Sequence, residues 1–154
     1  MYLPEIFNSI SMSRYDRTNE IIKLNKQLKK EGIVLTVKDA KEIITERDKT
    51  LKSTGRMEIN MDVIHSIIKE VGKSPYVNQE NAVETVNDIY EVFHYLKNST
   101  SDLLSDSEIL ESIMFFYNEI YRGSIELVMG KGVEKIVCNF KNGRDLINTK
   151  EEED

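Results

Sequence analysis

The sequence contains one cysteine, two prolines, seven glycines and no tryptophan among its 154 residues. A single cysteine excludes a disulfide framework and any zinc site built from several thiolates. The low content of glycine and proline excludes collagen-like and low-complexity chains. Hydrophobic residues nevertheless make up 40% of the chain. That content and this length are enough for one domain with a packed core and short for two.

Long hydrophobic runs are also missing. The first residues lack the basic stretch and apolar core of a secretory signal. The segment richest in apolar residues, 109–121, is interrupted by Glu111 and Glu119, whereas a membrane-spanning helix needs about 20 consecutive apolar residues. The sequence therefore predicts a cytoplasmic protein that does not enter a membrane.

Signals that start and stop helices are frequent, and signals for strands are scarce. A short turn is expected at Pro4, and Ser105 with Glu108 has the form of a capping box. After residue 124 we expect a short helix, a break at Gly130 and Gly132, and a second short helix. The other predicted helices cover 14–31, 36–53, 61–71, 78–97 and 105–121.

These elements predict the fold class and the domain organisation. Short connections between amphipathic helices are typical of an all-α protein, here a single compact domain of about six helices in an antiparallel array. The domain is expected to span residues 1–143. Residues 144–154 end in the run KEEED, which predicts a disordered acidic tail. No internal repeat is visible.

Three apolar side chains fall outside the predicted core faces. On a helical wheel, Val92 and Tyr95 lie opposite Ile89 and Phe93, and Phe115 lies opposite the core face of its own helix. Such residues pack against a second neighbour if their helices are central, or they form an exposed patch that binds another protein or a second copy. The exposed patch leads to our first prediction, a non-catalytic interaction or accessory protein that self-associates or binds an unidentified protein partner.

Positive charge is concentrated in one part of an acidic chain. The formal net charge is −6, yet residues 14–56 carry +5 and residues 57–154 carry −10. Within the basic part, Lys23, Lys26 and Lys30 share one helical face that is able to neutralise phosphates. A nucleic-acid-binding regulator is therefore the alternative function, although a solvated lysine face accounts for the same residues.

Arg47 is a charged residue on an apolar helical face, which it shares with Ile43, Ile44 and Leu51. Its stem is expected to pack on the core while its guanidinium group pairs with a carboxylate. The alternative is an anion-binding arginine in a cleft, which would belong with the lysine face.

Catalytic patterns are absent from the sequence. Asp62 with His65, and Glu91 with His94, have the carboxylate-x-x-His spacing of di-iron bundles. On a helical wheel, however, both carboxylates point away from the core faces. Cys138 has apolar neighbours and is predicted to be core, and no nucleophile motif or phosphate loop occurs. The sequence therefore predicts no enzyme activity, no metal and no cofactor.

Six short segments share a pattern of helix caps and turns and span most of residues 29–128. They read KEGIVLTVKDAKEI, GRMEI, SPYVNQEN, FHYLKNST, LLSDSEIL and RGSIELV. In this order they resemble a small bacterial family known as a domain of unknown function. The resemblance implies a compact, soluble, mainly helical intracellular domain. It implies no activity, and so it assigns no functional residue.

Overall fold

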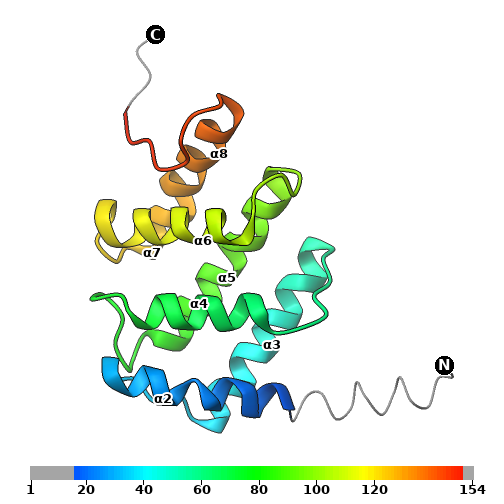
Figure 1. Ribbon diagram of the computed structural model, residues 1–154, viewed down its shortest axis with the longest axis vertical. Helices are drawn as coiled ribbons and strands as arrows, with labels where there is room; N and C mark the ends of the chain where they lie inside the picture. Colours follow the sequence, from blue (N-terminus) through cyan, green and yellow to red (C-terminus); the bar gives the residue numbers. More distant parts are fainter. Residues whose placement is uncertain (1–15, 151–154) are drawn as a thin grey trace, which may run out of the picture.

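The structure is a computed structural model that describes residues 16–150 (Figure 1). Within this range the regular secondary structure is helical and contains no strand. The predicted all-α single domain is confirmed. The turn predicted at Pro4 lies outside the described residues.

The helices form three consecutive pairs that stack on one another (Figure 1). In each pair, a first helix is followed by a turn and a second helix. The first pair joins residues 16–31, which include α2 (Asn25–Leu28) and a 3₁₀ turn (Lys29–Glu31), to α3 (Val37–Thr54). The second pair joins α4 (Asp62–Gly72) to α5 (Ala82–Ser99), and the third joins α6 (Asp106–Phe115) to α8 (Val133–Lys141).

The pairs place their helices in two rows. In one row α2 contacts α4 and α4 contacts α6; in the other, α3 contacts α5 and α5 contacts α8. Equivalent helices begin at residues 62 and 106 in the first row and at residues 37 and 82 in the second. The pair therefore recurs after roughly 45 residues, a length found in helical repeat proteins. The repetition is not visible in the sequence, because the shape of the pair recurs while its residues do not.

Two of the helices begin with complete capping boxes. The Thr36 hydroxyl accepts a hydrogen bond from the Asp39 N–H (3.1 Å), and the Asp39 carboxylate accepts one from the Thr36 N–H (2.9 Å). Ser105 and Glu108 make the same exchange at the start of α6, with distances of 3.1 and 3.0 Å. Each box satisfies backbone donors that the first turn leaves free. The prediction at Ser105 is therefore confirmed.

Two predicted boundaries are wrong for local reasons. The Asn78 side chain accepts hydrogen bonds from the N–H groups of Glu80 and Asn81, both at 3.0 Å, and so forms a turn before the helix starts at Ala82. The predicted break at Gly130 and Gly132 is instead a π-turn (Val128–Gly132) between α7 (Ile125–Leu127) and α8. A second π-turn (Phe116–Ile120) extends α6. A wider turn keeps the backbone helical where a cap-based pattern indicates a stop.

The predicted disordered tail begins too early. Asn139 is fully buried in α8, and its amide donates hydrogen bonds to the carbonyl oxygens of Leu146 and Asn148, both at 2.9 Å. Leu146 packs against the core. Residues 144–150 therefore lie against α8, because Leu146 and the asparagines hold them there and the acidic run starts only at Glu151. Residues 151–154 lie outside the described residues.

The α5 helix is the centre of the core. It contacts α3, α4, α6, α7 and α8, and so it buries side chains on more than one face. Ile89, Tyr90, Val92 and Phe93 are all buried. A central helix therefore explains why apolar residues of α5 fall on two sides of its helical wheel.

Candidate functional site

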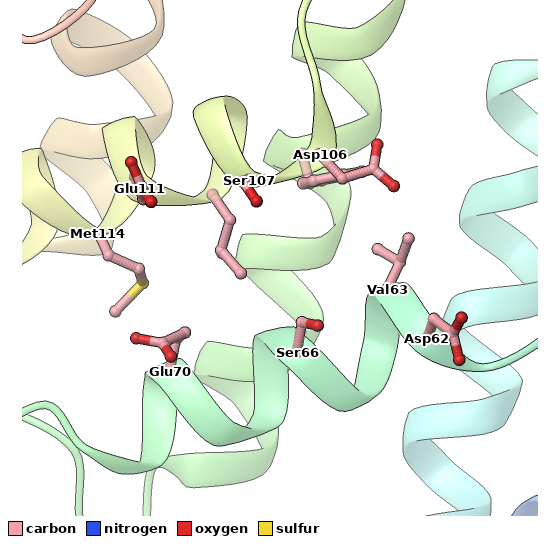
Figure 2. A pocket seen from close by; sticks show the side chains of 10 residues that line it. Asp62, Val63, Ser66, Glu70, Asp106, Ser107, Glu111 and Met114 are labelled. Atoms are coloured by element: carbon pink, nitrogen blue, oxygen red, sulfur yellow. The ribbon is translucent and has the colours of Figure 1, made fainter.

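A groove of about 320 Å³ runs between α4 and α6, the first helices of the second and third pairs (Figure 2). Its apolar part consists of Val63, Phe93, Leu110 and Met114, with Phe93 buried beneath the groove in α5. In Figure 2, Met114 reaches from α6 toward Glu70 on α4. Six polar residues complete the lining: Asp62, Ser66, Glu70, Asp106, Ser107 and Glu111.

Helical periodicity places these side chains. On α4, Asp62, Ser66 and Glu70 are spaced four residues apart and therefore share one face. On α6, Ser107, Leu110 and Met114 follow an i, i+3, i+7 pattern and also share one face. The middle of α4 thus carries a small, exposed residue, Ser66, on the face that lines the groove.

The groove is acidic. Among the described residues, its only neighbouring cations in ion pairs are Lys97, 2.6 Å from Asp106, and Lys73, 3.3 Å from Glu70. Asp62 and Glu111 form no ion pair with any described residue. Four carboxylates against two lysines leave a net negative charge around an apolar floor. Such a site favours a cationic ligand with apolar parts.

A second groove, between α3 and α5, is acidic without an apolar floor. Val83 is the one apolar residue among its nine lining residues. Burial and the charges of Glu84 and Glu91 raise the pKa of the Asp88 carboxyl above its ordinary value. Because apolar contact supplies most binding energy in protein grooves, the α4–α6 groove is the stronger candidate.

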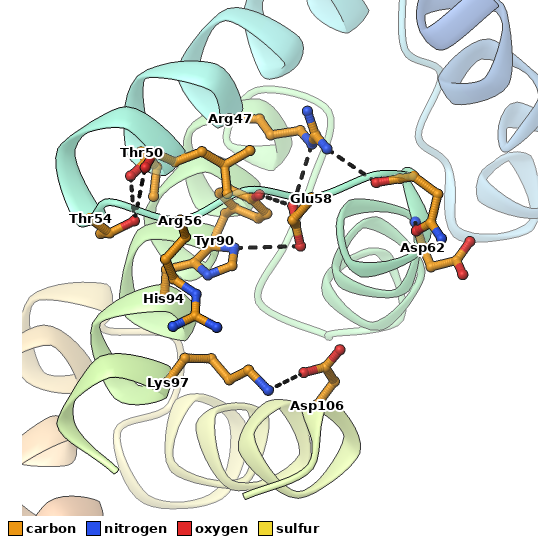
Figure 3. A network of polar contacts seen from close by, with 12 residues as sticks. Arg47, Thr50, Thr54, Arg56, Glu58, Asp62, Tyr90, His94, Lys97 and Asp106 are labelled. Carbon is orange, nitrogen blue, oxygen red and sulfur yellow. Dashed lines mark hydrogen bonds and ion pairs between the residues drawn. The ribbon is translucent and has the colours of Figure 1, made fainter. Parts of the chain in front are cut away.

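A buried polar cluster lies behind the loop that leads into α4 (Figure 3). Glu58 points inward from this loop to three partners. One of its carboxylate oxygens lies 3.5 Å from Nε of Arg47 and accepts a short hydrogen bond from the Tyr90 hydroxyl. The other lies 3.6 Å from Nε2 of His94, an ion-pair contact longer than an ordinary hydrogen bond. The cluster thereby joins α3, α5 and the loop.

Charge balance in the cluster favours an ionised Glu58. Burial by itself raises the pKa of the Glu58 carboxyl, but the contacts with His94 and Tyr90 and the charges of His94 and Arg47 outweigh it and hold this pKa below its ordinary value. Burial and the hydrogen bond to Glu58 raise the pKa of the Tyr90 hydroxyl far above its ordinary value. The tyrosine is therefore a neutral hydrogen-bond donor, and the cluster has a structural character.

The structure settles the two readings of Arg47 in favour of the ion pair. Its side chain is 4% exposed, and its guanidinium contacts Asp48 (3.1 Å), Glu58 and the Asn60 carbonyl oxygen (3.1 Å). The alternative of an open anion site at Arg47 is therefore wrong, because carboxylates already occupy the position an anion would take. Lys23, Lys26 and Lys30 are exposed on the first helix.

The structure separates the three predicted interface residues. Val92 is 3% exposed, packs with the core and reaches the surface only at the base of a pocket beside Tyr95. Tyr95 is 54% exposed and lines this pocket, of about 320 Å³, with Met129 and Val133. Phe115 is half-buried and packs edge-on against Phe116, with ring centroids 5.6 Å apart. Only Tyr95 presents most of its side chain to solvent.

The two carboxylate-x-x-His pairs do not meet. His65 contacts Glu20 (3.6 Å) and His94 contacts Glu58. In residues 16–150 no group of three or more His, Cys, Asp or Glu side chains is arranged to hold a metal ion. No helix in the same range has both the length and the hydrophobicity needed to cross a bilayer.

A family model matches residues 20–146, and its description is a family of unknown function, DUF6323. The chain belongs to this family. The match includes both helices of the groove and all four members of the buried cluster. Comparisons with curated proteins and with solved structures each gave no match.

Sequence reasoning missed the groove and the partner of Arg47. The acidic face of α4 is present in the spacing of Asp62, Ser66 and Glu70, but no pattern indicates that α6 lies beside it. Glu58 stands in a short connection between helices, where a carboxylate is ordinarily solvated. The nearest signal was its position between two large apolar residues, Met57 and Ile59, because extended backbone sends alternate side chains to opposite sides.

Proposed function

We propose that this protein is a non-catalytic interaction module that binds a segment of another protein in the α4–α6 groove. The observation that carries the proposal is the groove itself, which is open to solvent, apolar at its floor and acidic at its rims. Stacked helical pairs are a common scaffold for extended protein-binding surfaces. The absence of catalytic function is part of the same proposal.

The chemistry of the lining supports a binding role. Among the described residues that line the groove, Ser66 and Ser107 carry the only hydroxyl groups, and none is a histidine, lysine or cysteine. A serine nucleophile requires an adjacent base and donors for the developing oxyanion. Recognition of apolar and cationic groups needs only the residues that are present.

The alternative proposal, nucleic-acid binding through Lys23, Lys26 and Lys30, draws less support. These lysines are exposed, but Arg47 does not join them, and the α4–α6 and α3–α5 grooves are lined by carboxylates. Carboxylates repel phosphates, and nucleic-acid affinity depends on uninterrupted positive charge. A labelled oligonucleotide tests this alternative at low salt. Binding by the wild type that is lost when Lys23, Lys26 and Lys30 are replaced by Gln would favour it.

Site-specific photocrosslinking in the native host tests the leading proposal. A benzophenone amino acid replaces Ser66 in the groove or, as a matched control, Ser53, which is exposed on α3. We expect a covalent protein adduct from position 66 and none from position 53. An adduct with the mass of two chains would identify the partner as a second copy. No adduct at position 66, or the same adducts from both positions, would refute a binding role for the groove.

A further inference from the structure

The three most exposed large apolar side chains of the described residues lie next to the groove in the chain. Met57 is 95% exposed, Ile59 104% and Leu103 74%. Met57 and Ile59 belong to the loop that leads into α4 at Asp62, and Leu103 belongs to the loop that leads into α6 at Asp106. Asp62 and Asp106 both line the groove. We name Met57, Ile59 and Leu103 the apolar tip.

The loops that carry the apolar tip are held in place. Arg56 forms an ion pair with Asp102 and donates a hydrogen bond to the Asn98 side chain (2.8 Å), which joins the two loops. Glu58 is bound in the buried cluster, and the Asn60 carbonyl oxygen accepts a hydrogen bond from Arg47 (3.1 Å). Residues 56, 58 and 60 are thus anchored, while Met57 and Ile59 between them face solvent. An anchored loop loses little conformational entropy when a partner covers it.

The length of α4 along the groove matches a short partner helix. The eleven residues of α4 give it a length of about 16 Å at 1.5 Å per residue, which matches roughly three turns of a partner helix. Ridges of side chains at i, i+3 and i+7 on α6 present the spacing that a third helix uses for packing. Amphipathic helices that enter such grooves use anchors at the same spacing.

The carboxylates around the groove determine which charges fit on the polar face of a bound partner helix. Asp62 and Glu70 stand on the α4 side of the groove, and Asp106 and Glu111 stand on the α6 side. A helix with an apolar stripe toward Val63, Leu110 and Met114 places its flanking residues beside these carboxylates. Lysine and arginine at the flanks complement them, and acidic residues there are repelled.

We infer that the occupant of the α4–α6 groove is a basic amphipathic helix of a partner protein, whose apolar stripe continues from the groove onto the apolar tip. The inference rests on the proposed function and adds the class of partner. Glu70 and Glu111 pair with its cationic flanks, and Met57, Ile59 and Leu103 cover its apolar end.

The charge requirement is tested with a fluorescein-labelled 15-residue helix of leucine and lysine and its leucine–glutamate counterpart. Anisotropy measures the affinity of each for the full chain. We expect the lysine peptide to bind and the glutamate peptide not to bind. The variant Glu70→Lys/Glu111→Lys should lose at least about tenfold in affinity. The matched control Glu31→Lys/Glu126→Lys makes the same change in net charge at exposed positions outside the groove and should lose less than about threefold.

The apolar tip is tested with Met57→Ser/Ile59→Ser, which removes two exposed side chains and should leave thermal unfolding unchanged. We expect about a threefold to tenfold loss of affinity for the lysine peptide. Equal losses in both charge-reversal variants, or an unchanged affinity in the tip variant, would overturn the inference. Displacement of the peptide by spermidine at the same molar concentration would also overturn it, since a free polycation would then suffice. If any of these results were found together with a crosslink at position 66, the inferred class of partner would be wrong. The proposed binding function of the groove would still hold.

Discussion

At the residue scale, Glu58 joins the interior of the molecule to its surface. The same carboxylate shares the charge of the buried Arg47 with Asp48, and it holds the loop in which Met57 and Ile59 are the most exposed large apolar side chains of the described residues. Removing Glu58 is costly because the buried Arg47 then keeps only part of its neutralising charge. Glu58 is therefore important for stability and for the presentation of the apolar tip.

We expect Glu58→Gln to lower the free energy of unfolding at pH 7 by roughly 2–3 kcal/mol. Urea unfolding monitored by circular dichroism measures this change. Glu46→Gln is the control, because Glu46 pairs on the surface with Lys49 (3.2 Å) and such a pair contributes about 0.5 kcal/mol or less. Equal losses in the two variants would contradict the structural role of the buried cluster.

The same variant should have a pH signature. Because the pKa of Glu58 is lower in the folded state than its ordinary value of 4.5, its stabilising contribution is complete above the pKa of the unfolded chain. The contribution is lost as the pH falls through the folded-state value. The stability difference between wild type and Glu58→Gln should therefore shrink as the pH falls below 4.5. A difference that grows below pH 4.5 would have the opposite sign and would refute this account.

Tyr95 and Phe115 should respond differently to replacement by serine. Tyr95→Ser should change the free energy of unfolding by less than about 0.5 kcal/mol, because most of its side chain is already exposed. Phe115→Ser should cost about 1–2 kcal/mol, because the ring is half-buried against Phe116. Sedimentation velocity then tests self-association with Tyr95→Ser alone. A large loss of stability in Tyr95→Ser would show that this residue is core and remove it as an interface candidate.

Among the connections between helices, the turn after α3 and the turn before α7 depend on glycines in different ways. Gly55 and Gly123 both have positive φ, +69° and +87°. A Cβ atom on Gly55 would meet nothing within 4 Å, whereas one on Gly123 would lie 2.6 Å from the Cβ atom of Tyr76. Backbone strain is therefore common to both positions, and a steric clash belongs to Gly123 alone.

We expect Gly55→Ala to cost about 1 kcal/mol, the usual penalty of a left-handed residue with a Cβ atom. Gly123→Ala should cost at least about 1 kcal/mol more, because the Tyr76 side chain and the turn between α6 and α7 must also shift. Thermal and urea unfolding of the two variants provide the comparison. Similar losses would mean that the turn at Gly123 relaxes easily.

The elements also show what the sequence could predict. Caps and stops such as Thr36, Ser105 and Gly55 are local chemistry, and they placed the helices and the fold class correctly. The helix start predicted at Asn78 is wrong because an asparagine side chain that accepts backbone hydrogen bonds can cap a helix or form a turn before one, and here it forms the turn. Glu58, the groove and the apolar tip depend on which helices become neighbours, and that is decided by contacts between residues far apart in the chain.

At the scale of the whole molecule, the stacking of pairs distributes stability unevenly. In stacked helical repeats each unit contacts only its neighbours, so an inner unit has two interfaces and an outer unit has one. Here α5 of the middle pair contacts α3 on one side and α8 on the other. The middle pair also carries α4, Glu58's partners Tyr90 and His94, and the floor of the groove.

Native-state hydrogen exchange should therefore find the slowest amides in α5, at Ile89 and Tyr90. Amides of residues 16–31 at one end of the stack should exchange at least tenfold faster, which corresponds to about 1.4 kcal/mol of opening free energy. Glu58→Gln should narrow this difference, because it loosens the contact of α5 with α3 and the loop before α4. If the amides of α5 exchanged no more slowly than those of the first pair, the domain would open as one cooperative unit. The middle pair that carries the floor of the groove would then be no more stable than the end of the stack.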